Sequence, residues 1–381
     1  MTDHEPETAD YVYGNTRVRA RKAALLAGSD YEALIGLDLD GLLGALAGTA
    51  YRSEVEAALP RFHGVRRLHE AVRSHLGRSL RELARFYSGA ARQIVEEMLS
   101  SWDVRNAVTL LRGQAAGASA DDVVPLIVPV GRIDEVSARE VARQPEFAAA
   151  IDLLVAWQLP TPEDARAIAN AWPEYERSAD LAIFEHAVVS AHAERVSAAL
   201  RRFGSGAEPL AVALREENDD LSVLTALRLR EAVLVSTGAQ DSGSPSGLSA
   251  AGTAPQGSEA AAQALLSGAS AAAEVLAGAF FGLTRGEVAA SVLALPRTDR
   301  WQRPLQQWAR TGDLVALQDE LERSRVSRRL RRFLTGDPLG IDMPMAFATA
   351  KETEARNLRI LGEVAVGGVD ADVARARLVV P

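Results

Sequence analysis

Residues 65–86, VRRLHEAVRSHLGRSLRELARF, carry the pattern that decides the fold class of this protein. Apolar side chains recur there at steps of three and four residues, which places them on one stripe of an α-helix. The stripe consists of Val65, Leu68, Val72, Leu76, Leu80, Leu83 and Phe86. Because helical periodicity also dominates the rest of the chain, the sequence predicts an all-α protein.

Several helix starts are marked along the chain. Ser-x-x-Glu sequences at Ser29, Ser79 and Ser137 have the form of capping boxes, although Ser79 lies within the apolar stripe. Pro162 precedes two acidic residues, which favours a helix that begins at this proline. Segment 123–130 carries two prolines, and we expect an extended connector there rather than a central strand.

The composition limits the chemistry that the chain can perform. Its 381 residues predict two or three domains, and 48% hydrophobic with 24% charged residues is typical of a soluble globular protein. The absence of Cys excludes disulfides and thiolate chemistry, and it favours the cytoplasm. With 42 Lys and Arg against 51 Asp and Glu, the chain lacks the basic surplus that nucleic-acid binding requires.

Only two of the basic residues are lysines, Lys22 and Lys351. A phosphate-binding loop requires Gly-x-x-x-x-Gly-Lys-Ser/Thr, and a Schiff base requires a desolvated lysine. Lys22 follows Arg21 and Lys351 precedes Glu352, so we expect neither lysine to occupy such a context. The sequence therefore predicts no nucleotide-hydrolysing loop.

Neither a leader nor a membrane span is expected from the sequence. Residues 1–10 form an acidic, polar tail without the basic and apolar regions of a secretory signal. The most apolar stretch, 271–283, is interrupted by Glu274 and is shorter than a bilayer requires. Residues 236–272 are rich in Ser, Gly, Ala, Pro and Gln, a composition that predicts a linker.

Two short motifs occur three times in the chain. The sequence Arg-Phe-x-Ser/Thr-Gly is followed each time by an acidic residue with Asn or Ser three positions later. The copies are Arg85, Phe86 and Gly89 with Asp103 and Asn106; Arg202, Phe203 and Gly206 with Asp219 and Ser222; and Arg332, Phe333 and Gly336 with Glu354 and Asn357. The phenylalanines are 117 and 130 residues apart and the acidic positions 116 and 135, so both motifs keep nearly the same register.

The repeat predicts three helical bundles that superpose on one another. They comprise residues 11–119, 120–235 and 273–381, and the linker lies before the third. Residues three apart lie on one face of a helix, where an acid and an Asn can bond a neighbouring helix end or backbone group. A repeated structural hydrogen bond is the simpler interpretation, and a binding site made three times is the alternative.

The histidines and paired aspartates do not form the pattern of a catalytic or metal site. The histidines at positions 63, 69 and 75, and at 186 and 192, are six residues apart, whereas metal pairs on a helix need three or four. The Asp pairs at 121–122 and 219–220 are not followed by an acid three positions on, as an Asp-rich metal motif requires. We therefore expect no catalytic residue, no cofactor and no metal.

Arginines gather in two places that are candidates for an interface. Segment 323–332 contains six of them, and a solvated helical face is the simpler interpretation. Contact with an acidic partner or with anionic lipid headgroups is the alternative. For segment 17–21 a solvated or intramolecular role is the simpler interpretation, and a surface that contacts a protein partner is the alternative. The candidate interface residues are Arg17, Arg19, Arg21, Arg325, Arg328, Arg329 and Arg332.

Stretches along the whole chain resemble the C subunit of prokaryotic V/A-type ATPases, which is related to the d subunit of the vacuolar ATPase. The similar stretches are Tyr11-Val-Tyr13-Gly-Asn15-Thr-Arg17-Val-Arg19-Ala-Arg21-Lys22, Thr49-Ala-Tyr51, Asp103-Val-Arg-Asn106 with Leu111-Arg112-Gly113, Asp337-Pro-Leu-Gly340, and Lys351-Glu-Thr-Glu354-Ala-Arg-Asn357. They occur in the family's order. Ser222 departs from the Asn of the other copies, and segment 236–272 looks like an insertion.

The resemblance implies a funnel of three similar bundles around a pseudo-threefold axis. It also implies a non-catalytic central-stalk subunit on the cytoplasmic face of the membrane, between the shaft made by the D and F subunits and the proteolipid ring. Membrane contact would be indirect, through the ring, and no nucleic acid is expected. The alternative is a soluble helical scaffold unrelated to ion transport, whose repeat records a duplication.

Overall fold

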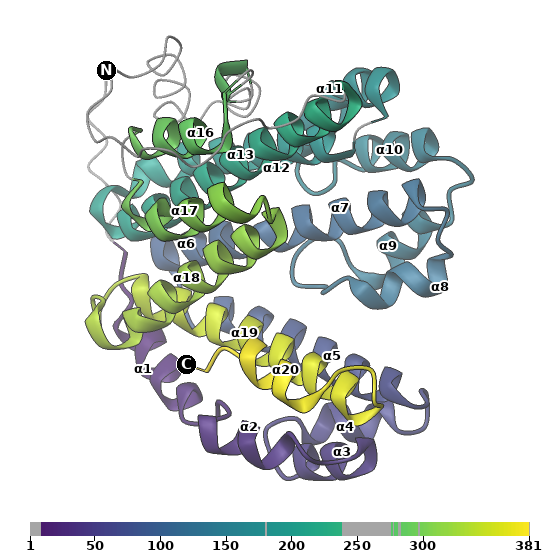
Figure 1. The fold of residues 1–381 in the computed structure, drawn as a ribbon. Helices are drawn as coiled ribbons and strands as arrows, with labels where there is room; N and C mark the ends of the chain where they lie inside the picture. Colours follow the sequence, from purple (N-terminus) through teal and green to yellow (C-terminus); the bar gives the residue numbers. More distant parts are fainter. Residues whose placement is uncertain are drawn as a thin grey trace. The chain divides into compact units, whose positions relative to one another are not determined.

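The computed structural model describes residues 9–179, 181–237, 276, 278–280, 283–295 and 298–380 (Figure 1). Every regular element in these ranges is helical, which confirms the predicted all-α class. Apart from its first two residues, which end a helix, the predicted linker 236–272 lies outside the described residues, as do positions 1–8 of the acidic tail.

Contacts divide the chain into two compact units, each assembled from segments that are distant in sequence. The first unit contains the described parts of 1–162, 199–210 and 326–381, and the second contains those of 163–198 and 211–325. The two ends of the chain thus belong to the same unit. The division into three superposable bundles stays a prediction.

The first unit is built around the long helix that the opening sequence pattern predicts. Its elements are α1 (Val12–Lys22), α2 (Gly28–Leu34), α3 (Leu39–Ala47), α4 (Arg52–Ala58), α5 (Val65–Arg85), α6 (Gly89–Leu99), α7 (Ser101–Ala115), α8 (Ala120–Val123), η1 (Val124–Leu126), α9 (Glu135–Ala142), α10 (Phe147–Ala156), η2 (Arg201–Gly206), α19 (Asp342–Ala365) and α20 (Ala371–Arg377). It also holds the end of α18 (Leu314–Thr335).

Helix α5 begins at Val65 as predicted and ends at Arg85, with Phe86, the last residue of the predicted stripe, as its C-cap; it packs against α4 and α19 (Figure 1). Leu68, Val72, Leu80 and Leu83 on this stripe are fully buried. Helix α19 is buried along most of its length and also contacts α1 and α3. Burial of whole Leu and Val side chains contributes about 1.5–3 kcal/mol each, so the α5–α19 contact is a main source of stability in this unit.

Two of the predicted capping boxes are wrong because helices begin elsewhere. Ala27, not Ser29, is the N-cap of α2, and the Asp30 carboxylate accepts the Ala27 N–H at 2.7 Å. Ser79 lies in the interior of α5, where the apolar stripe continues through it. A helix start needs a backbone that turns away from helical geometry, and tertiary packing placed that turn at other residues.

The third predicted box is displaced by one turn. Asp134 is the N-cap of α9 and accepts the Ser137 N–H at 2.8 Å, so Ser137 is the third helical residue rather than the cap. Helix α11 (Pro162–Ser178) begins at Pro162, as predicted. The expected connector 123–130 is extended only in its second half, since Val124–Leu126 form a 3₁₀ turn.

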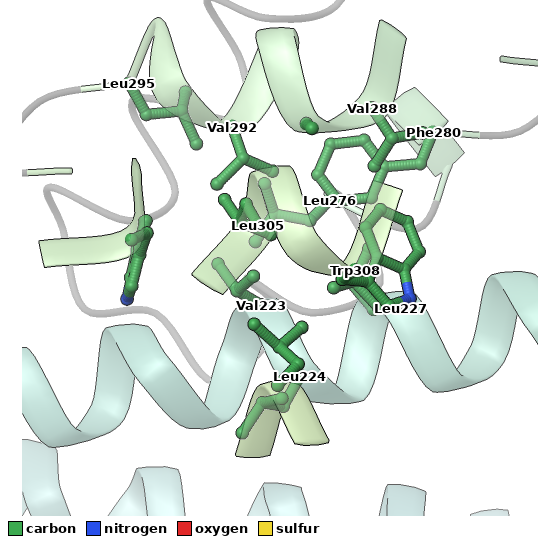
Figure 2. Close-up of a cluster of buried hydrophobic side chains, with 14 of the residues drawn as sticks. Val223, Leu224, Leu227, Leu276, Phe280, Val288, Val292, Leu295, Leu305 and Trp308 are labelled. Atoms are coloured by element: carbon green, nitrogen blue, oxygen red, sulfur yellow. The ribbon is translucent and has the colours of Figure 1, made fainter. Parts of the chain in front are cut away.

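The second unit has its own apolar core. Its elements are α11, most of α12 (Leu181–Leu200), most of α13 (Glu208–Thr237), α16 (Arg285–Leu293), η3 (Asp299–Trp301), α17 (Gln302–Thr311) and the first part of α18. Figure 2 shows Val223 and Leu227 of α13 facing Leu305 and Trp308 of α17, with Val292 of α16 in the same cluster. Both tryptophans of this cluster are about 1% exposed.

We expect Gly14→Ala and Gly44→Ala to change stability in opposite directions, although both are glycine-to-alanine changes within helices. A Cβ at Gly14 would lie 2.1 Å from the Tyr87 ring, whereas nothing lies within 4 Å at Gly44. Overpacking should lower the free energy of unfolding of Gly14→Ala by about 1–3 kcal/mol. Gly44→Ala should raise it by about 0.5–1 kcal/mol through helix propensity.

Urea unfolding followed by circular dichroism measures both values. Equal shifts in the two variants would show that α1 does not pack on Tyr87 as described.

Candidate functional site: three motif turns meet on α1

The first repeated motif has the same place in each copy: it lies at the end of a long helix. Arg85 is the last residue of α5, and Gly89 begins α6 with a φ of 52°. Arg202, Phe203 and Gly206 form η2 directly after α12. In the third copy α18 ends at Thr335, immediately before Gly336.

Two of these turns are held by polar side chains of α1 and of the residue before it. The Tyr11 hydroxyl donates to the Gly206 carbonyl of the second copy at 3.1 Å. The Tyr87 hydroxyl, within the first copy, donates to Asn15 Oδ1 at 2.8 Å. The rings of Tyr11 and Tyr87 meet edge to face at 5.8 Å, so the first two turns lie together at the start of α1.

The third turn is held by the other end of the same amide. Asn15 Nδ2 donates to the carbonyl of Pro338 at 3.0 Å and to that of Gly340 at 2.9 Å. Asn15 is about 1% exposed, and these three bonds use both its oxygen and its nitrogen. Three regions more than 100 residues apart therefore converge on residues 11–15, the first through the Tyr87 side chain and the other two through backbone carbonyls.

The motif phenylalanines lie beneath cationic side chains. Arg17 and Arg21 of α1 lie over Phe86, at 4.9 and 5.9 Å from the ring centroid. Lys22 lies 4.4 Å from the centroid of Phe333. In the second copy the cation is the motif's own arginine, since Arg202 stacks on Phe203 at 4.5 Å. A cation over an aromatic ring contributes about 0.5–1 kcal/mol at such exposed sites.

The candidate interface arginines divide into paired and exposed ones. Arg21 forms an ion pair with Glu82 at 3.1 Å, Arg325 pairs with Glu217 at 3.5 Å, and Arg332 pairs with Asp342. Arg17 and Arg19 are exposed. Arg328 and Arg329 are half-buried and also interact with other groups.

The second motif forms the same pair of hydrogen bonds, which we call the clasp, in two of its copies. Asn106 Nδ2 on α7 donates to the Val128 carbonyl at 2.8 Å, and the Val128 N–H donates back to Asn106 Oδ1 at 3.0 Å. On α19, Asn357 makes the same two bonds with Val379, at 2.8 and 3.3 Å. The separation in sequence is 22 residues in both copies. Each Asn thereby fastens a returning backbone segment to its helix.

The acidic residues three positions earlier accept backbone donors. Asp103 accepts the N–H groups of Arg132 and Ile133 at 2.8 and 2.9 Å. Gly131 permits this approach, because a Cβ there would lie 2.0 Å from the carboxylate. In the third copy Glu354 accepts the Leu26 N–H at 2.7 Å.

The second copy differs from the other two. Asp219 lies 3.6 Å from the Arg300 guanidinium, and the adjacent Asp220 accepts the Trp301 indole N–H at 2.6 Å and pairs with Arg300 at 2.9 Å. The Ser222 hydroxyl is fully buried and has no hydrogen-bond partner among the described residues. A serine is too short to make the two-bond clasp of an asparagine.

Glu354 also anchors a buried ionic network. Its carboxylate accepts hydrogen bonds from the Tyr51 hydroxyl at 2.7 Å and from the Lys351 ammonium at 2.6 Å. Lys351 Nζ lies 3.1 Å from His75 Nε2, and His75 Nδ1 lies 3.3 Å from Glu54. The expectation that neither lysine is desolvated is wrong for Lys351, which is 4% exposed. Its partner His75 is 276 residues away, so no local sequence context marked it.

His75 is a neutral member of this network. Burial, and then the neighbouring Lys351 ammonium, lower the pKa of His75 from 6.5 to about 4. Because Lys351 donates to Nε2, the ring proton is assigned to Nδ1, which faces the Glu54 carboxylate. The Tyr51 ring stacks on the imidazole at 3.9 Å and closes the network on that side.

Two further histidines lie beside carboxylates. His192 lies 3.0 Å from the buried Asp164, and His69 lies 3.5 Å from Glu363. In the described residues no group of three or more His, Asp or Glu side chains is arranged to hold a metal ion. Among the helices described here, none has the length and apolarity that crossing a bilayer takes.

The sequence profile of the ATP synthase (C/AC39) subunit family matches residues 14–244. The chain belongs to this family. The match begins within α1 and covers both motifs in their first two copies. The resemblance seen in the sequence to the C-subunit family of V/A-type ATPases is therefore confirmed.

Individual members of the family share moderate sequence identity with this chain. The A-type ATP synthase C subunit of Methanosarcina barkeri is 29% identical over 147 residues, which are 39% of this chain and 41% of the relative. That of Archaeoglobus fulgidus is 29% identical over 126 residues, 33% of this chain and 37% of the relative. The V-type ATP synthase C subunit of Deinococcus radiodurans is 26% identical over 197 residues, which are 51% of this chain and 56% of the relative. The matches thus span between 37% and 56% of these relatives' lengths.

Sequence reasoning found the motif residues but missed what gathers them. Tyr11 and Asn15 stand in the stretch that resembles the family, yet nothing in that stretch shows which turns they bind. Tyr87 occupies the variable position of the first motif copy. The spacing of the histidines argued only against a metal site at His75, and the fold shows that Lys351 and Glu54 lie beside its two ring nitrogens.

We expect Asn106→Ala to lower the free energy of unfolding by about 2–4 kcal/mol, because it leaves the buried N–H and C=O of Val128 without partners. Asn357→Ala should lower it by about 1–2 kcal/mol, because Val379 is half-buried and water can replace part of the lost bonding. The exposed Asn170→Ala should change it by less than about 0.5 kcal/mol. Urea titration of the three variants measures these values. A cost at Asn357 no larger than at Asn170 would contradict the clasp.

We expect His75 to make stability depend on pH. Between pH 6.5 and 4 the unfolded chain binds a proton at His75 that the folded chain does not, so the free energy of unfolding falls as the pH decreases through this window. The loss should approach roughly 3 kcal/mol at pH 4. His75→Gln should remove this part of the pH dependence, and the exposed His63→Gln should leave it unchanged.

Urea unfolding at pH 7, 6 and 5 compares the three proteins. If the free energy of unfolding changes with pH by the same amount in the wild type and in His75→Gln, the pKa of His75 is not lowered by folding.

Proposed function

We propose that the chain is a non-catalytic central-stalk subunit of a V/A-type rotary ATPase. It joins the shaft formed by the D and F subunits to the proteolipid ring, and so couples ATP turnover to proton or sodium transport. The family match over residues 14–244 carries this proposal. The relatives' names, which make them C subunits of A-type or V-type ATP synthases, support it.

We further propose that the chain consists of three similar bundles, residues 11–119, 120–235 and 273–381, around a pseudo-threefold axis in a funnel. The common order of elements supports this, since every copy has a long helix that ends at the Arg-Phe motif and, further on, a helix with the acid–Asn/Ser pair; in the first copy α6 lies between the two. The convergence of the three motif turns on α1 supports it as well.

A coupling that transmits torque must resist deformation, and the first unit has features suited to that task. Buried, fully bonded polar groups hold helices in one arrangement, because sliding them would leave charges unpaired in a low-dielectric interior. Glu354 ties α19 to the segment after α1 through Leu26, and to the start of α4 through Tyr51. Asn357 adds the C-terminal segment at Val379.

The partners that we propose are the D and F subunits and the ring, with membrane attachment on the cytoplasmic face through the ring. No step in this role requires a cofactor, a metal or nucleic acid. The charge balance of the chain, net −9, agrees with the last point, because nucleic-acid binding depends on a basic surplus.

Co-purification tests the proposal. A tagged chain, expressed in its own host, should be recovered from detergent-solubilised membranes together with the D, F and proteolipid subunits, identified by mass spectrometry. Recovery of the chain only from the soluble fraction, with none of these subunits, would overturn the proposal and favour a helical scaffold unrelated to ion transport.

Charge reversal tests whether the arginines of α18 take part in assembly. Arg323→Glu/Arg331→Glu changes two exposed residues of the arginine-rich segment, and Arg66→Glu/Arg143→Glu changes two exposed arginines elsewhere by the same charge. If the segment contacts an acidic partner, only the first pair should reduce recovery of the complex. Equal recovery with both pairs would assign these arginines a solvated role.

A further inference from the structure

The outer face of α1 is basic and carries no acidic residue. Only Gly14, Asn15 and Val18 of this helix are buried. Its four cations are exposed, although Arg21 pairs with Glu82, and Arg17 and Lys22 lie over Phe86 and Phe333. Arg17, Arg19, Arg21 and Lys22 give the helix a charge of +4. In a chain with a net charge of −9 this is a local surface of opposite sign.

Large apolar side chains stand exposed beside these cations. Tyr13 is 67% and Val12 is 55% exposed on α1. Leu334 is 83% exposed in the last turn of α18, and Leu339 is 56% exposed on the turn that follows this helix. The turn lies against α1, since Asn15 bonds its carbonyls at Pro338 and Gly340 and Lys22 lies over Phe333. Figure 1 shows the purple α1 next to this end of α18. We name the set Val12, Tyr13, Arg17, Arg19, Lys22, Leu334 and Leu339 the basic–apolar surface.

The cations of this surface are held in place without being neutralised. Arg17 lies on Phe86 and donates to the Tyr13 hydroxyl at 2.9 Å, and Lys22 lies on Phe333. An aromatic ring orients a cation but carries no net charge, so both keep their full charge toward solvent. A stacked guanidinium also keeps in-plane N–H donors for a bidentate oxyanion.

We propose that the basic–apolar surface binds anionic phospholipid headgroups of the membrane. Basic side chains mixed with exposed aliphatic and aromatic ones match such an interface, where phosphate lies above acyl chains. The two leucines protrude, so a protein partner would have to supply a fitted pocket for each, whereas acyl chains close around any protrusion. The inference rests on the proposed function for its location, because a chain seated on a proteolipid ring faces the membrane area that the ring encloses.

Vesicle flotation with the purified full-length chain tests the proposal without any other subunit. The probes are vesicles of phosphatidylcholine with phosphatidylglycerol in equal amounts, and vesicles of phosphatidylcholine alone. The chain should float only with the anionic vesicles, and a rise from 50 to 500 mM salt should release it. Arg19→Glu/Lys22→Glu should lower the partition coefficient at least about thirtyfold, at roughly fivefold for each lost cation.

Matched variants distinguish binding through this surface from a general effect of the net charge of the chain on vesicle binding. Leu334→Ser/Leu339→Ser should weaken flotation about tenfold at constant charge. Arg66→Glu/Arg143→Glu, with the same charge change away from the surface, should bind as the wild type does. Circular dichroism and thermal melting verify that every variant is folded.

Absence of flotation with anionic vesicles would overturn the proposal, and so would equal loss in the two charge-reversal pairs. A third outcome is that all variants float as the wild type does, but Arg19→Glu/Lys22→Glu no longer co-purifies with the D, F or ring subunits. In that case the surface is a protein interface, and lipid binding is rejected. The proposed function itself fails only in the co-purification of the wild-type chain, so the two failures are distinguishable.

Discussion

The buried carboxylate of Glu354 is the constraint on which the first unit depends. A carboxylate that is 1% exposed must have its lone pairs occupied, because an unpaired buried charge costs several kcal/mol. Here the Leu26 N–H, the Tyr51 hydroxyl and the Lys351 ammonium occupy them, and these groups come from three segments of the chain. Lys351 in turn fixes His75 on α5. The segment after α1, the start of α4, α5 and α19 must therefore assemble together.

The repeats show how a duplicated sequence can be used twice in the same way and once differently. Asn106 and Asn357 each fasten a backbone segment 22 residues downstream, whereas the second copy has Ser222, which cannot span the same gap. There Asp219 and Asp220 face Arg300 and Trp301 instead. The Arg-Phe turns, by contrast, lie at the end of a long helix in all three copies, and Tyr11, Asn15 and Tyr87 bring them to α1.

The chemistry of the buried groups fits a mechanical role. Lys351 and His75 are desolvated, which in many proteins marks a catalytic group, but both are engaged by carboxylates and close-packed rings. Membership of the ATP synthase (C/AC39) subunit family also supports the proposed mechanical role. The surface that we propose for membrane contact lies on the outside of the first unit, on the cationic face of α1 and the leucines beside it.

The sequence by itself determined the helical class, the position of α5, the two repeated motifs and the family, because periodicity and motif order are local properties of the chain. It misplaced the starts of α2 and α9 and the environment of Lys351, because each depends on residues that only folding brings near. Tertiary structure alone decided that the three motif turns meet on α1 and that Lys351 pairs with His75 across 276 residues. The spacing of side chains along a helix follows directly from the sequence, whereas the pairing of residues far apart in the chain depends on how the helices pack.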